Sequence, residues 1–141
     1  MKKFMLVVGV ALLYFTATRA QDNSSTEAKK DTAQISFAQT TYDEGSVKPG
    51  SHTFEFEFSN TGTKPLVLTN VAPSCGCTIA DWPKEPIMPG KKGVIRATYN
   101  ASGVGNFQKN ITVHSNAQTP TVVISFKVNV TNPADEAKAT N

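Results

Sequence analysis

The sequence lacks the motifs of the common enzyme classes. No serine lies in a nucleophile elbow, no glycine-rich phosphate loop follows a strand-like segment, and no His-x-x-x-His pair occurs. Glu55 and Glu57 alternate on one face of a strand-like segment, whereas acid–base catalysis needs carboxylates held in a pocket. We therefore expect that the protein is not an enzyme and needs no cofactor.

The chain also has no excess of positive or negative charge once residues 1–20 are set aside. The sequence has 14 basic and 11 acidic residues, but three of the basic residues and none of the acidic ones precede Gln21. A chain that begins at Gln21 therefore carries 11 of each sign. This balance, without a basic cluster, argues against nucleic acid or an anionic membrane surface as a partner.

The one apolar run is too short to cross a membrane. It extends from Phe4 to Phe15, about a dozen residues, where a helix needs roughly twenty. Lys2 and Lys3 precede it and Thr18-Arg19-Ala20 follows, which is the pattern of a secretory signal peptide over residues 1–20. We expect cleavage near Ala20, in preference to an uncleaved anchor, and export to the periplasm or cell surface. The mature chain then has no transmembrane span.

The rest of the chain divides into one domain and two polar ends. Residues 21–33 are polar and charged, and they lack the apolar surface that offsets the entropy of ordering, so they are expected to form a flexible linker. Residues 132–141 resemble them and are expected to form a disordered tail. The domain is expected to span residues 34–131.

Hydrophobic residues within this domain recur with a period of two. Phe54, Phe56 and Phe58 lie on one face of a predicted strand, and the glutamates between them lie on the other. The same alternation is found around Ile35, Leu66 and in the segments 94–99, 106–114 and 121–130, with turn residues between them. This pattern predicts an all-β, immunoglobulin-like antiparallel β-sandwich of about seven strands. A small Greek-key barrel is the alternative.

Several short motifs together resemble a known family. They are Asn60-Thr61-Gly62, Ser74-Cys75-Gly76-Cys77-Thr78, Pro86 to Gly90, Gly105-Asn106-Phe107 and Ser115-Asn116. In this order they resemble the bacterial domain-of-unknown-function family 1573, whose members are exported and similar to the major-sperm-protein and cilium-associated Ig-like domains. The resemblance implies the fold, export and an interaction role, and it implies no activity. Asp31-Thr32-Ala33 also resembles a bacterial O-glycosylation signal, which would place a glycan on Thr32.

The only two cysteines, Cys75 and Cys77, admit four interpretations. A local disulfide is favoured because an exported protein meets an oxidising compartment, and Gly76 lets the chain bend between them. Thiol exchange would require a neighbour that lowers a thiol pKa, and none adjoins the pair. A copper(I) site could combine both sulfurs with Met88, although two cysteines fall short of a closed structural zinc site. Inert packing of two free thiols is the last possibility.

The loop that carries the cysteines also carries Trp82, Pro83 and Pro86. Proline lowers the entropy lost on binding, and tryptophan is frequent at binding hot spots. The sequence therefore predicts an interaction loop, for another envelope protein or protein segment, with Trp82 folding back to cap the sandwich as the alternative. The predicted function is an exported Ig-like binding or structural module of the cell envelope. A periplasmic copper(I)-handling protein or a thiol-redox module that uses Cys75 and Cys77 is the alternative.

Overall fold

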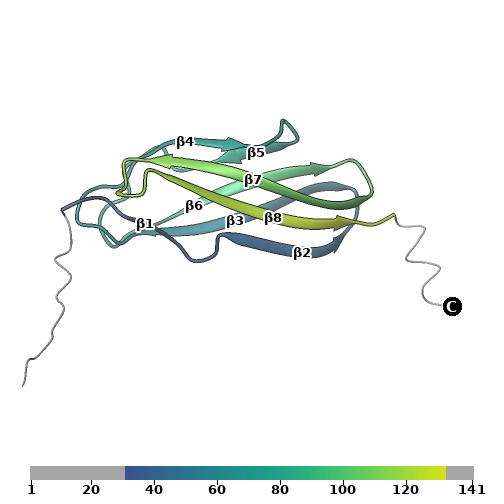
Figure 1. Cartoon of the computed structure of the whole chain (residues 1–141), viewed down its shortest axis with the longest axis horizontal. Helices are drawn as coiled ribbons and strands as arrows, with labels where there is room; N and C mark the ends of the chain where they lie inside the picture. The colour runs from purple at the N-terminus through teal and green to yellow at the C-terminus, as the bar shows by residue number, and fades with distance from the viewer. Residues whose placement is uncertain (1–30, 133–141) are drawn as a thin grey trace, which may run out of the picture.

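The structure, a computed structural model, describes residues 31–132, which form a sandwich of two four-stranded sheets (Figure 1). The predicted signal peptide, residues 21–30 of the predicted linker and residues 133–141 of the predicted tail lie outside the described residues. The predicted all-β, immunoglobulin-like sandwich is confirmed. No helix in the described part is long and apolar enough to cross a membrane.

The first sheet has the strand order β1-β3-β6-β5 and the second has the order β2-β8-β7-β4. The strands are β1 (Ile35–Phe37), β2 (Thr41–Val47), β3 (Gly50–Asn60), β4 (Leu68–Pro73), β5 (Thr78–Asp81), β6 (Lys92–Ala101), β7 (Gly105–Ser115) and β8 (Thr121–Val130). The two ends of the described chain lie at opposite ends of the sandwich in Figure 1.

Alternation along the central strands produces the core. On β3 the three phenylalanines are at most 2% exposed, while the glutamates between them face water and bind basic residues of β6. From the second sheet, Phe126 of β8 stacks on Phe54 with ring centroids 4.2 Å apart. Tyr99 of β6 also contacts Phe126, at 5.5 Å. These rings join the sheets without any covalent bridge between them.

Two strands, β2 and β5, were not predicted. On β2 only Tyr42 and Val47 are even partly buried, so the segment has no alternation to detect. The chain leaves the first sheet after β1 and joins the second as β2, where it runs parallel to β8 with an irregularity between Asp43 and Ser46. Strand β5 has only four residues. The sandwich therefore has eight strands rather than about seven.

The domain begins before the predicted boundary at residue 34. Ala33, assigned above to the linker, is 2% exposed and belongs to the core. The carbonyl of Thr32 accepts a hydrogen bond from the backbone N–H of Thr63 at 2.9 Å. Asp31 pairs with Lys64 at 3.0 Å, and the hydrogen bond from the Lys64 ammonium lowers the pKa of the Asp31 carboxyl. Residues 31–33 are therefore fixed against the turn after β3.

Candidate functional site

The Cys-Gly-Cys turn carries the chain from one sheet to the other. Strand β4, an edge strand of the second sheet, ends at Pro73. Strand β5, an edge strand of the first sheet, begins at Thr78. The N–H of Ser74 donates to the carbonyl of Asn110 on β7 at 2.9 Å, and the N–H of Asn100 on β6 donates to the carbonyl of Cys77 at 3.0 Å. The turn is therefore anchored on both sheets, and it projects beside the ends of β4 and β5 in Figure 1.

The two cysteines lie within disulfide distance of each other. Their Sγ atoms are 2.03 Å apart and their Cα atoms 5.3 Å apart. The hydroxyl of Thr78 lies 3.6 Å from the Cys75 sulfur. Glycine at position 76 was expected to let the chain bend without obstruction by a side chain. A Cβ at this position would have no atom within 4 Å. Small size at position 76 is therefore not a steric requirement of the turn.

Replacing both cysteines with serine should change the protein locally. A closed loop of three residues removes little entropy from the unfolded chain, so the free energy of unfolding should fall by only about 1.6 kcal/mol. Hydrogen exchange at residues 74–80 should rise more than exchange in β3. The measurements are chemical denaturation and amide exchange of both proteins, and loss of the whole fold in the variant would contradict this account.

Trp82 folds back onto the sandwich and is not an exposed anchor. Its ring packs against the core, and its indole N–H is buried with no hydrogen-bond partner in the described part of the chain. The Lys84 ammonium lies 2.8 Å from the ring centroid and covers it. Pro83 is half-buried and Pro86 is exposed. The geometry thus favours the capping alternative for Trp82, since a tryptophan gains more by covering apolar core than by facing water.

Met88 is too far from the cysteines to complete a metal site with them. Its carbonyl accepts a hydrogen bond from Lys91, just before β6, whereas Cys77 is bonded to Asn100 near the other end of that strand. Nine residues of extended chain span roughly 30 Å. No group of three or more His, Cys, Asp or Glu residues suited to a metal is found among residues 31–132. The structure therefore does not bring Met88 together with Cys75 and Cys77, the set considered as the alternative metal site.

Ile79, which sequence reasoning missed, is the most exposed large apolar side chain of the described part. It is 73% exposed, on the outer face of β5. A surface depression of about 450 Å³ adjoins it and includes Cys77 and Gly76 of the turn; its other lining residues, Ser51, Thr98, Asn100 and Ser102, are uncharged. The sequence offered no signal for this exposure, because in β5 the polar Thr78 is buried and the apolar Ile79 faces outward.

Ion pairs cover the neighbouring part of the same sheet face. Arg96 binds Glu55 and Lys92 binds Glu57, each at 2.7 Å. Toward the turn the face becomes uncharged, with Thr53 and Thr98 joined by a hydrogen bond between their hydroxyls at 3.2 Å. Ile79 therefore lies at the end of this face nearest the turn, while the charged Asp81, two residues farther along β5, is exposed on the same face.

The backbone of β5 is also open along one side. Because the Asn100 N–H bonds the Cys77 carbonyl, residues 77, 79 and 81 direct their backbone groups toward β6. The backbone groups of Thr78 and Ala80 then point away from β6, and the Thr78 N–H is bonded to the Cys75 carbonyl at 3.3 Å. Ala80 thus presents a donor and an acceptor at the edge of the sheet.

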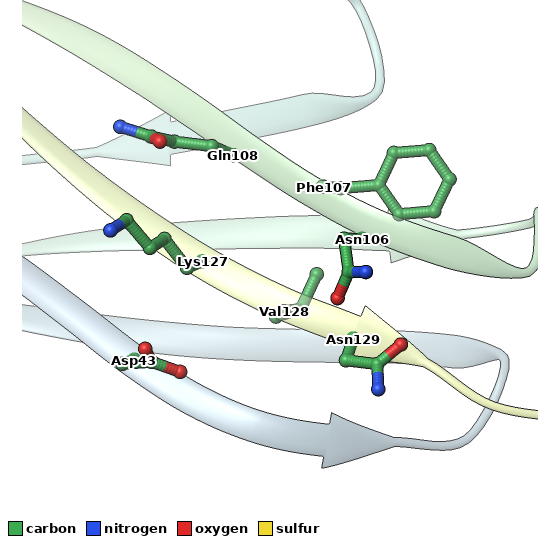
Figure 2. A pocket seen from close by; sticks show the side chains of 7 residues that line it. All are labelled: Asp43, Asn106, Phe107, Gln108, Lys127, Val128 and Asn129. Carbon is green, nitrogen blue, oxygen red and sulfur yellow. The ribbon is translucent and has the colours of Figure 1, made fainter.

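A second depression lies on the other sheet. It has a volume of about 310 Å³ and is lined mainly by polar side chains of β2, β7 and β8, including Asp43, Lys127, Asn106 and Asn129. Figure 2 shows the carboxamides of Asn106 and Asn129 close together, in agreement with their pairing across β7 and β8, while the Phe107 ring points away from them. This depression has no exposed apolar side chain comparable with Ile79.

Comparison with known proteins places the chain in one group of folds. The model of the family described as "Protein of unknown function (DUF1573)" matches residues 35–130. A protein of unknown function from Porphyromonas gingivalis W83 has a TM-score of 0.64 at 22% identity, over 77% of this chain and 51% of that chain, so this chain spans about half of its length. No curated protein matches the sequence.

Two further solved structures show how widely the fold is used. The PapD-like (ASH) domain 7 of human CEP192 has a TM-score of 0.56 at 11% identity, over 74% of this chain and 89% of that chain. The YadV chaperone has a TM-score of 0.53 at 16% identity, over 75% of this chain and 58% of that chain. At these identities the likeness establishes the PapD-like, immunoglobulin-like fold alone.

Proposed function

Since the chain belongs to the DUF1573 family of proteins of unknown function, we propose a role from its geometry: it binds an extended segment of another protein at the β5 edge. The module would act in the bacterial cell envelope after export and cleavage near Ala20. It would be a binding protein, with no catalytic residues and no cofactor.

The observation that carries this proposal is the exposure of Ile79 on an edge strand. A partner strand that pairs with β5 would bond the free backbone groups of Ala80 and cover the Ile79 side chain. Burying an isoleucine contributes about 1.5–3 kcal/mol. The adjoining depression, which has no charged side chain in its lining, would receive an apolar or small polar side chain of the partner.

The disulfide would prepare this edge for binding. It closes the turn directly before β5 and adds a covalent restraint to the hydrogen bonds that anchor the turn on β6 and β7. An edge held in its bound conformation loses less entropy when a partner binds. The Cys-Gly-Cys turn would thus act by positioning β5, with no redox cycle. The chaperone among the structural neighbours is consistent with a protein partner.

Ile79→Asp should abolish capture of the partner from an envelope extract. A charged side chain would have to be buried in the complex, which should weaken binding at least tenfold, while the melting temperature stays within about 2 °C because the side chain is exposed in the free protein. The measurement is a pull-down with quantitative mass spectrometry.

Val123→Asp is the matched control, since Val123 is 54% exposed on the outer face of the other sheet. It should capture the partner as well as the unaltered protein does. If the Ile79→Asp variant captures the partner as well as the unaltered protein does, the β5 edge is excluded as the binding site.

A further inference from the structure

The first half of β7 is a second open edge, on the sheet opposite β5. Strand β4 pairs with β7 only from Leu68↔Ser115 to Pro73↔Ile111, and the chain then leaves for the first sheet. No strand of the described chain therefore lies beside Gly105 to Lys109 on the side away from β8. The Cys-Gly-Cys turn creates this opening, because it diverts the chain that would otherwise continue β4.

The backbone along this opening is oriented for strand pairing. Asn110 directs its backbone toward β4, where its carbonyl accepts from the Ser74 N–H and its N–H donates to the Ser74 hydroxyl at 3.2 Å. By the alternation of an antiparallel ladder, Asn106 and Gln108 direct their N–H and C=O groups to the same side. Two donors and two acceptors thus face the space in line with β4.

The side chains that border the opening have an unusual combination of chemistry. Phe107 and Lys109 point toward the interior of the sandwich and are half-buried. The Lys109 ammonium lies 5.7 Å from the Phe107 ring centroid and 5.9 Å from that of Tyr99. Ion pairs within the described residues are made by Lys64, Lys92 and Arg96, so the Lys109 ammonium has aromatic faces beside it and no carboxylate.

We propose that the open half of β7 binds an extended protein segment that carries a carboxylate two residues from an apolar side chain. Paired with Asn106 and Gln108, such a segment places its carboxylate beside Lys109 and its apolar side chain beside Phe107. Opposite charges on neighbouring strands stabilise their pairing. The bound segment is short, because β4 and the turn at Ser74 already occupy the positions beside β7 from Asn110 onward. This site is separate from Ile79 and β5.

An inward lysine has a competing explanation, in which it only prevents the edge from pairing with other chains. The two explanations make opposite predictions. If Lys109 only prevents pairing, the unaltered edge of β7 binds no peptide, and replacing the lysine causes self-association. A ligand-binding lysine makes the unaltered edge bind acidic strands, and its removal abolishes the preference for acid.

The test is an NMR titration of the purified ¹⁵N-labelled chain with three peptides. They are Thr-Val-Thr-Glu-Thr-Val-Thr and the same sequence with Gln or Lys at the centre, which present the required spacing in either strand direction. The Glu peptide should bind about fivefold more tightly than the Gln peptide, with the Lys peptide weakest. The amides of Asn106 and Gln108 should become protected from exchange.

Variants separate the role of Lys109 from general charge. Lys109→Met should lose the preference for Glu over Gln, and Lys109→Arg should keep it. Lys127→Met, on the exposed face of the adjacent β8, should leave it unchanged. The proposal is overturned by equal binding of the Glu and Gln peptides or by protection at Ala80 instead of Gln108. It is also overturned by an unaltered chain that binds no peptide while Lys109→Met sediments as a dimer or larger species.

Discussion

Asn60→Ala should lower the free energy of unfolding by about 3–4 kcal/mol, although the residue lies far from any proposed binding site. Asn60 is fully buried at the end of β3. Its Nδ2 donates to the carbonyls of Lys64 and Ile87 at 2.7 and 2.8 Å. Its Oδ1 accepts from the N–H groups of Gly62 and Gln34 at 3.0 and 3.3 Å. Alanine would remove all four bonds; the Ile87 carbonyl would keep its bond from the Leu66 N–H, but the other three groups would lose this partner, and buried unsatisfied groups are costly.

Asn116→Ala is the matched control for this prediction. The Asn116 side chain also bonds two backbone groups, accepting from Val67 N–H at 2.8 Å and donating to the Pro65 carbonyl at 3.1 Å, but the residue is exposed. Water can replace those bonds, so the loss should be about 1 kcal/mol. Urea denaturation of the three proteins measures both values. Equal losses for the two variants would mean that burial of Asn60 does not set its effect.

Phe56→Ala should lower the free energy of unfolding by about 3–5 kcal/mol. Phe56 lies at the centre of β3, is fully buried, and meets the Tyr42 ring edge to face with centroids 5.0 Å apart. Its removal leaves a cavity between the sheets, and no covalent bridge holds the sheets together at that level. The variant should unfold cooperatively at a much lower urea concentration.

Phe37→Ala gives the comparison for the edge of the core. Phe37 is half-buried on the three-residue edge strand β1 and contacts Phe58 at 5.7 Å. Its truncation should cost about half as much as that of Phe56, because water and neighbouring side chains can fill the space. A larger loss for Phe37 than for Phe56 would place the centre of the core away from β3.

The sequence predicted the strands whose two faces have different surroundings. Strands β3, β6, β7 and β8 alternate because one face meets the other sheet and the other meets water. Strand β2 lies at an edge and exposes five of its seven residues, so it has no such signal. Ala33 was assigned to the linker because a single alanine in a polar segment does not reveal that it packs under a distant turn.

The candidate site was predicted only in part from the sequence, because several of its features depend on how distant segments pair and pack. The position of the Cys-Gly-Cys turn between strands followed from local sequence. The exposure of Ile79 depends on β5 being an edge strand, which only the pairing of distant segments decides. Trp82 could bind a partner or cap the core, and its amphipathic ring suits either. Met88 is close to Cys77 in the sequence, but the chain has crossed the length of the sheet between them.

The β5 edge beside the Cys-Gly-Cys turn is where we propose that this module binds its partner. Site-specific photo-crosslinking in growing cells tests this binding site, with a photoreactive phenylalanine analogue in place of Ile79 in one strain and of Val123 in another. We expect one crosslinked protein from position 79, lost when both cysteines are replaced with serine, and none of it from position 123. The same product from position 123, or no product from position 79, would contradict the account.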